Sequence, residues 1–190
     1  MSKNITPEFS RIVRIDELTE KKNTIELESN AAERAALAKR FDLVDLSVLT
    51  AKLKLTVNGN GEVAVGGTLH AEIAQKCVVT LDPVPEVIDD EIEVLFSPHV
   101  SESDLPSSPD DLENLSEEEL MALLDQPEPL VDGRIDLGEI VAQYLAVAMN
   151  PYPRKEGAEA PVQLADNDED EKPHPFAKLA ALKDKLEPKG

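Results

Sequence analysis

The sequence predicts an α+β fold: an antiparallel β-sheet covered by an amphipathic C-terminal helix, with an acidic insertion and a flexible C-terminal tail. Two patterns carry this prediction. Three successive segments, 51–57, 63–79 and 88–96, alternate apolar and polar residues with a period of two, which is typical of strands with one solvated face. A later segment, 136–149, repeats its apolar residues at helical spacing.

The region before these strands predicts two short strands and one helix. Apolar residues cluster at 12–15 and again at 25–27, so we expect two N-terminal strands that join the sheet. The segment 31–41 is rich in helix-forming residues. Asn30 and Glu33 have the spacing of a capping box, so the helix begins after Asn30; we expect it at an edge or end of the sheet.

The central strands contain two turn signals. Residues Asn58 to Gly61 predict a hairpin, because Asn and Gly both accept a positive φ. The pair Gly66-Gly67 lies within the next strand and predicts a bulge or a tight bend. The alternation of that strand, extended, places Cys77 on its buried side.

The helix at 136–149 has the clearest helical pattern in the chain. Asp136 is the expected N-cap, and Glu139 is the expected reciprocal partner of a capping box. Pro151 and Pro153 end the helix. Its apolar stripe, which we expect to cover the sheet, consists of Leu137, Ile140, Val141, Tyr144, Leu145 and Ala148.

Half of the net charge lies in one segment. The chain has 190 residues and a formal net charge of -20, and the insertion 97–130 contains ten acidic residues and no basic one. We expect a solvated loop there rather than sheet, with a short helix capped by Ser116 and Glu119. Without a basic footprint, direct RNA binding is disfavoured. Candidate partner-binding residues in the insertion are Leu120, Leu123 and Leu124.

The expected organisation is a single domain, 1–153, followed by a charged tail, 154–190. The tail is too polar to bury a core, but its end has apolar residues near helical spacing, which predicts a short terminal helix. Candidate partner-binding residues there are Phe176, Leu179 and Leu182.

The residue types that carry catalysis or bind metals are sparse. Cys77 is the single cysteine, so no internal disulfide forms, and we expect a buried, unreactive thiol. His70, His99 and His174 lack metal-ligand spacing, and no phosphate-binding or nucleophile motif occurs. We therefore expect no catalytic residues, no metal and no cofactor. With neither an apolar leader nor a membrane-length apolar segment, a cytoplasmic protein is expected.

Several segments together resemble the YceD family, the large ribosomal RNA subunit accumulation proteins. The segment 66–96 resembles the central signature, 132–158 the C-terminal block and 33–41 the early helix. The ending PHPFAKLAALK is similar to tails of the alphaproteobacterial branch. The signature positions implied by the resemblance are Gly67, Cys77, Leu81, Pro83, Asp136, Leu137 and Glu139.

The resemblance implies a non-enzymatic role in ribosome biogenesis, in the synthesis, processing or stability of 23S rRNA. Because the chain is acidic, we expect a basic ribosomal protein or a large-subunit assembly factor as its partner. The family's gene neighbourhood implies an alternative, regulation of a phospholipid-synthesis enzyme. Many members carry a CxRC signature and a further C-terminal Cys, which suggests a metal site. Here Val78, Val79 and Thr80 follow Cys77, so no metal is expected.

Overall fold

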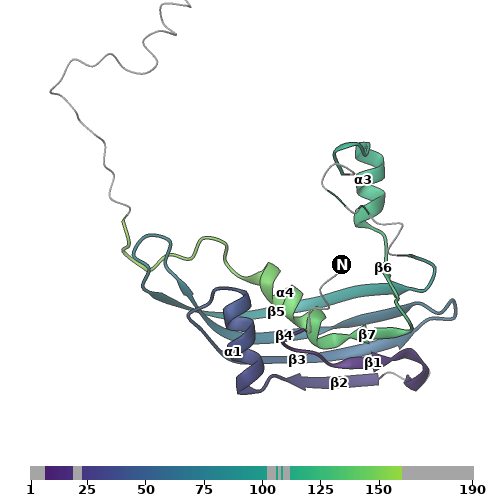
Figure 1. Ribbon diagram of the computed structural model, residues 1–190, viewed down its shortest axis with the longest axis horizontal. Helices are drawn as coiled ribbons and strands as arrows, with labels where there is room; N and C mark the ends of the chain where they lie inside the picture. The colour runs from purple at the N-terminus through teal and green to yellow at the C-terminus, as the bar shows by residue number, and fades with distance from the viewer. Residues whose placement is uncertain (1–6, 19–22, 102–105, 107, 109–111, 160–190) are drawn as a thin grey trace, which may run out of the picture. The chain divides into compact units, whose positions relative to one another are not determined.

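The main sheet of the computed structural model has five strands in the order β2-β3-β4-β5-β6 (Figure 1). The structure describes residues 7–18, 23–101, 106, 108 and 112–159. Neighbouring strands are antiparallel, except for the pair formed by β5 and β6. The strands are β2 (Asn23–Glu28), β3 (Asp45–Val57), β4 (Val63–Lys76), β5 (Pro83–Ser97) and β6 (Glu128–Pro129).

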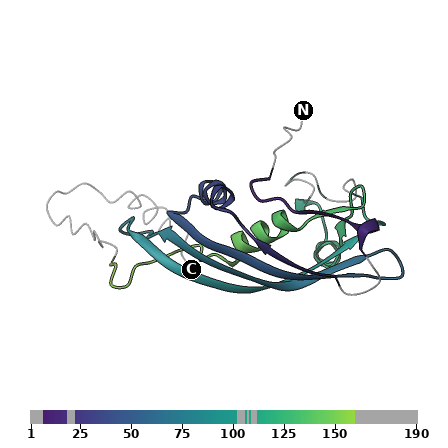
Figure 2. The same cartoon turned by 90° about the horizontal axis from the view of Figure 1, so that it is seen from below.

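Two helices cover the same face of this sheet. Figure 2 shows α1 (Ala31–Arg40) and α4 (Leu137–Ala148) on the concave side of the curved sheet. The core between them is aliphatic, built from Leu37 of α1, the inward residues of β3 and β4, and the predicted stripe of α4. The predicted α+β fold, with the C-terminal helix over an antiparallel sheet, is therefore confirmed.

The hairpin and both capping residues that the sequence predicted for these elements are present. The Gly61 N–H donates to the Asn58 carbonyl at 3.0 Å, and Gly61 has φ 84°. Asn30 and Glu33 form the complete capping box of α1. Asp136 caps α4 by accepting from two N–H groups of its first turn.

The glycine pair in β4 does not mark a bulge, contrary to the prediction. Its pairing with both neighbouring strands runs through Gly66 and Gly67 without a shift in register. The register shift lies instead between Leu46 and Val48 of β3. Gly67 is required by a close approach of β3: a Cβ there would lie 2.1 Å from the Lys52 carbonyl oxygen.

The strand boundaries also differ from the prediction. The strand predicted for 63–79 ends at Lys76, because Cys77 begins a turn. The strand predicted for 88–96 begins at Pro83. Its two prolines, Pro83 and Pro85, are tolerated because one edge of β5 is free over most of its length, so no ladder hydrogen bond is lost there.

The first N-terminal strand does not join the main sheet as expected. β1 (Ile12–Arg14) pairs with β7 (Arg134–Asp136) in a separate two-stranded sheet, and Ile15 opens a 3-10 turn, η1 (Ile15–Glu17). The preceding residue Phe9 is buried, and its backbone crosses closely over Gly138 of α4. This crossing holds β1 beside the segment that enters α4 and away from β2.

The acidic insertion contains more structure than a loop. Its helix, α3 (Glu117–Leu124), has the predicted capping box of Ser116 and Glu119. The expectation that the insertion contains no sheet is wrong at β6, where two residues pair parallel to Phe96 and Ser97. Within the described ranges, no helix combines the length and apolar character that a membrane span requires.

The chain divides into two units, residues 1–158 and 159–190. Nearly all of the second unit lies outside the described residues, and so do the predicted terminal helix and the candidate residues Phe176, Leu179 and Leu182. The division into a 1–153 domain and a 154–190 tail stays a prediction. The first unit nevertheless includes hydrogen bonds made by Pro153 and Lys155.

We predict that Gly67→Ala destabilises the fold, whereas Gly66→Ala does not. A Cβ at Gly67 would overlap the backbone of β3, and such overpacking costs roughly 1–3 kcal/mol or more. A Cβ at Gly66 would find its nearest neighbour, the Ile92 carbonyl oxygen, at 3.8 Å, an ordinary contact. Urea unfolding of the two variants measures the difference, and equal midpoints would contradict the close approach.

Candidate interaction surfaces

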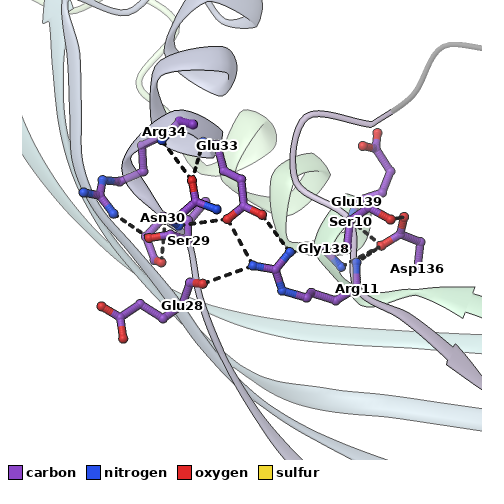
Figure 3. Close-up of polar contacts among 12 residues, drawn as sticks. Ser10, Arg11, Glu28, Ser29, Asn30, Glu33, Arg34, Asp136, Gly138 and Glu139 are labelled. Atoms are coloured by element: carbon purple, nitrogen blue, oxygen red, sulfur yellow. Dashed lines mark hydrogen bonds and ion pairs between the residues drawn. The ribbon is translucent and has the colours of Figure 1, made fainter.

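The signature residue Asp136 lies at the centre of a polar network between the N-terminal segment and α4 (Figure 3). Its carboxylate accepts hydrogen bonds from the Ser10 hydroxyl at 2.5 Å and from the Arg11 N–H at 2.7 Å. It also accepts from the N–H groups of Gly138 at 3.0 Å and Glu139 at 3.4 Å. One side chain therefore caps α4 and fixes the N-terminal segment beside it.

The network continues from Arg11 to the N-terminus of α1. The Arg11 guanidinium binds both carboxylate oxygens of Glu33, at 2.8 and 3.0 Å. This pairing holds the pKa of Glu33 below its ordinary value, and the Asn30 N–H that bonds the same carboxylate lowers the pKa further. Figure 3 shows the result: the caps of α1 and α4 are joined through a single arginine.

The predicted reciprocal role of Glu139 is wrong. Its carboxylate instead binds the Arg40 guanidinium in a bidentate pair, at 2.8 and 2.9 Å, and so connects the last turn of α1 to the first turn of α4. Arg40 also reaches Glu8 at 3.1 Å. A bidentate arginine contact is stronger than a cap bond to a neutral N–H. The pair joins residues 99 positions apart, so local spacing contained no signal for it.

Cys77 lies in a tight turn that directly follows β4. Its N–H donates to the Asp82 carbonyl at 2.8 Å, and its carbonyl accepts from the Leu81 N–H at 3.0 Å. The side chain is completely buried. Its sulfur accepts three backbone N–H groups, each at 3.4 Å: those of Val79, Thr80 and Lys155.

These donors make the thiol unusually acidic. The Lys155 N–H has the largest effect, followed by the hydroxyl and N–H of Thr80, and together with the Val79 N–H they outweigh burial and lower the pKa of Cys77 to about 6. Lys155 also pairs through its ammonium with Asp82 at 2.9 Å. The Val78 N–H donates to the Pro153 carbonyl at 2.9 Å, so three contacts fix the segment that follows α4 to this turn.

The surroundings of Cys77 do not fit a metal ion. Thr80 stands where a CxRC signature would supply its second thiolate, and the sulfur already accepts three N–H groups. In the part of the chain that the structure describes, no group of three or more His, Cys, Asp or Glu residues is placed to hold a metal. The turn therefore orders backbone rather than coordinating an ion.

The other signature positions lie at the Cys77 turn and at the start of α4. Leu81 is exposed at the tip of the Cys77 turn with φ 64°, and Pro83 begins β5. A positive φ at a bulky residue costs on the order of 1–3 kcal/mol, so the contacts of the turn hold Leu81 in a backbone conformation that the residue itself disfavours. Leu137 is fully buried, and its N–H donates to the Arg11 carbonyl at 3.0 Å. The structure thus brings Cys77, Leu81 and Pro83 together at one turn and Asp136, Leu137 and Glu139 together at the start of α4.

The histidines are not gathered around Cys77. His70 lies on the helix-free face of the sheet, where its Nδ1 contacts the Asp89 carboxylate at 2.7 Å. The His99 Nε2 contacts the Asn60 carbonyl at 3.1 Å, and His174 lies outside the described residues. In the described part of the chain, no histidine is therefore placed to act as a base for Cys77.

The candidate leucines of the insertion project from α3, in which no residue is buried. Leu120 is 40% exposed and Leu124 is 73% exposed, while Leu123 is half-buried. Met121, which sequence reasoning did not single out, is 60% exposed beside them. The three acids Glu117, Glu118 and Glu119 occupy the first turn, where negative charge stabilises a helix.

Comparison with known proteins gives one match. A family model described as "Large ribosomal RNA subunit accumulation protein YceD" matches residues 65–183, which is more than half of the chain. No curated protein and no solved structure matches.

We predict that Asp136→Ala lowers the free energy of unfolding by roughly 2–3 kcal/mol. The change removes an N-cap, worth about 1 kcal/mol, and leaves two donors of the N-terminal segment unpaired, at about 1 kcal/mol each. The matched variant Ser116→Ala removes the cap of α3, which buries nothing, so global unfolding should change by less than about 0.5 kcal/mol. Similar losses in both, measured by urea unfolding, would show that the network is not what holds α4.

We predict that the stability contributed by Cys77 rises with pH. The folded pKa is depressed to about 6, from an ordinary thiol value of about 8.5. The unfolded chain therefore binds more protons between these values, so the contribution is full above about 8.5 and is lost as pH falls through 6. The facing charges, Lys155 and Asp82, stay ionised throughout because their pKa values are shifted outward.

The measurement is the difference in unfolding free energy between the wild type and Cys77→Ser as a function of pH. The serine variant keeps the fold but cannot titrate in this range, so subtraction removes all other groups. A difference that stays constant from pH 6 to about 8.5 would mean that the three N–H groups do not favour the thiolate.

Proposed function

The chain belongs to the YceD family, and we propose that it acts as a non-enzymatic ribosome-biogenesis factor in the cytoplasm. In this role it supports the synthesis, processing or stability of 23S rRNA by binding a basic protein. The partner is a ribosomal protein or an assembly factor of the large subunit. The observation that carries the proposal is α3, an exposed helix that combines apolar and acidic side chains.

The apolar side of α3 is suited to contact with a protein. Leu120 and Leu124 are one helical turn apart, and Met121 lies three residues before Leu124, so all three lie close together on the helix. Large exposed apolar residues that cluster in this way mark interaction sites more often than chance exposure does. Because α3 buries no residue in the described structure, these side chains are available without unfolding the domain.

The charge of the insertion selects the class of partner. Ten acids without a base in 97–130 repel a phosphate backbone but accelerate encounter with a basic protein. The acidic insertion therefore competes with rRNA for the basic surface of that partner. The factor would hold an rRNA-binding protein until the RNA displaces it, and accumulation of 23S rRNA would follow indirectly.

We expect the double variant Leu120→Ala/Leu124→Ala to lose partner binding and function while folding normally. Truncating two central apolar anchors weakens an interface by about tenfold or more. The control is Val147→Ala, which removes a side chain that is 86% exposed on α4. Each variant is expressed in a deletion strain, and mature large subunits are quantified on sucrose gradients.

Binding is measured with purified large-subunit ribosomal proteins and, separately, with naked 23S rRNA fragments. The proposal requires that the wild type and Val147→Ala bind a basic ribosomal protein and restore large subunits, and that the double variant does neither. Full restoration by the double variant would refute the role of α3. Tight binding of naked rRNA, with no ribosomal protein bound, would refute the proposed partner.

A further inference from the structure

The outer edge of β5 is a long strand edge with little cover. β5 pairs with β4 from Pro83 to Phe96, but on its other side β6 pairs only with Phe96 and Ser97. Among the described residues, no other strand adds to this edge. The backbone from Pro83 to Leu95 therefore presents its outward N–H and C=O groups without a ladder partner.

Tyr144 of α4 identifies which residues face outward. Its hydroxyl donates to the Glu93 carbonyl and accepts from the Glu93 N–H at 3.3 Å, so both backbone groups of Glu93 point away from β4. Backbone direction alternates along a strand, so Val87, Asp89 and Glu91 also point outward. The side chain of Asp90 accepts the Glu91 N–H at 2.9 Å. Tyr144 thus occupies the edge at Glu93 and Asp90 occupies the Glu91 N–H, so the N–H groups open to an added strand are those of Val87 and Asp89.

The charge along this edge distinguishes between possible strands. Asp89 and Glu91 lie on one face and Asp90 on the other, and all three are exposed. A second copy of this chain, pairing β5 against β5, would place acids opposite acids, which destabilises a strand pair. A strand rich in Lys or Arg would instead place its charges beside these carboxylates.

The open edge leads into a groove of about 970 Å³ between β5, Tyr144 and the segment that follows α3. Four acids line this groove, Glu91, Glu93, Asp125 and Glu128, and no base does. Its apolar walls include Ile92, Val94 and Leu124. An extended chain that leaves the edge would find both negative charge and apolar surface there.

We infer that the free edge of β5 is a strand-addition site for an extended basic segment of a partner protein. The segment adds alongside Val87 to Glu91, with alternating basic and apolar residues over roughly seven positions, a common strand length. Main-chain hydrogen bonds supply the affinity, and the acids select the basic chain. The inference deepens the proposed function, because it gives a basic partner a second contact, on the edge of β5, which meets the apolar surface of α3 only at Leu124.

The probe is a synthetic seven-residue peptide of alternating Lys and Val, bound to the full chain and measured by calorimetry. Its control has the same sequence except that Pro replaces the central Val, which keeps the charge but removes an N–H and disfavours strand pairing. We expect the first peptide to bind and to slow hydrogen exchange at the Val87 and Asp89 amides, and the second to bind about tenfold more weakly. Equal binding of both peptides would overturn the inference.

Protein variants separate the edge from general electrostatic attraction. Asp89→Asn/Glu91→Gln should weaken binding of the peptide by about tenfold, because two charge-assisted contacts are lost. The charge-matched control Glu117→Gln/Glu118→Gln on α3 should change it less than about threefold, since these side chains are not at the edge. Equal effects of the two pairs would show non-specific attraction and overturn the inference.

Val87→Pro tests the backbone directly. It removes an outward N–H at the same parity as Pro83 and Pro85, so the ladder to β4 keeps all of its bonds. We expect an unchanged circular dichroism spectrum and loss of peptide binding; retained binding would contradict strand addition. The variant Leu120→Ala/Met121→Ala, which alters the apolar surface of α3 at two residues that do not line the groove, should bind the peptide normally. Strand addition at β5 can therefore be refuted while the proposed role of α3 stands, and the role of α3 can be refuted while strand addition stands.

Discussion

The Asp136 carboxylate is the interaction on which the arrangement of the domain depends. It caps α4, binds the Ser10 hydroxyl and the Arg11 N–H, and is connected through Arg11 to the cap of α1. Both helices that cover the sheet therefore take their position from one set of hydrogen bonds. Charge-assisted bonds of this kind fix direction as well as distance, and apolar packing of Leu, Val and Ile alone would not specify how α1 and α4 lie over the sheet.

Patterns within one element were reliable guides to the fold. The alternation of β3 and β4, the Asn-Gly hairpin and the caps at Asn30, Ser116 and Asp136 all follow from local chemistry, and the structure contains them. What failed involved contacts between distant segments. Glu139 has the spacing of a capping residue, yet Arg40 offers it a stronger bond. β1 has an ordinary strand pattern, but the close contact of Phe9 with Gly138 and the bonds of Ser10 and Arg11 to Asp136 place it beside β7.

For the candidate surfaces too, local features could be predicted from the sequence and contacts between distant segments could not. Exposed leucines in an acidic helix were visible in the sequence, because a short capped helix with that composition has nothing to bury itself against. The edge of β5 was not visible, since it depends on which strand lies beside which. Two signals did exist: Pro83 and Pro85 are tolerated only where an edge is free, and the run Asp89-Asp90-Glu91 is unusual within a strand. The acidity of the Cys77 thiol required Lys155, which is 78 residues away.

The pairing of β1 with β7 has a consequence for the order in which the protein forms during translation. The meander of β3, β4 and β5 contains only neighbouring strands and can assemble as soon as residue 97 has left the ribosome. The part of its apolar face that α4 covers stays bare until residues 134–148 emerge, because the N-terminal segment and α4 complete the core together. A nascent chain therefore passes through a partly folded state with exposed apolar surface. The rate of translation through residues 97–134 sets how long that state lasts.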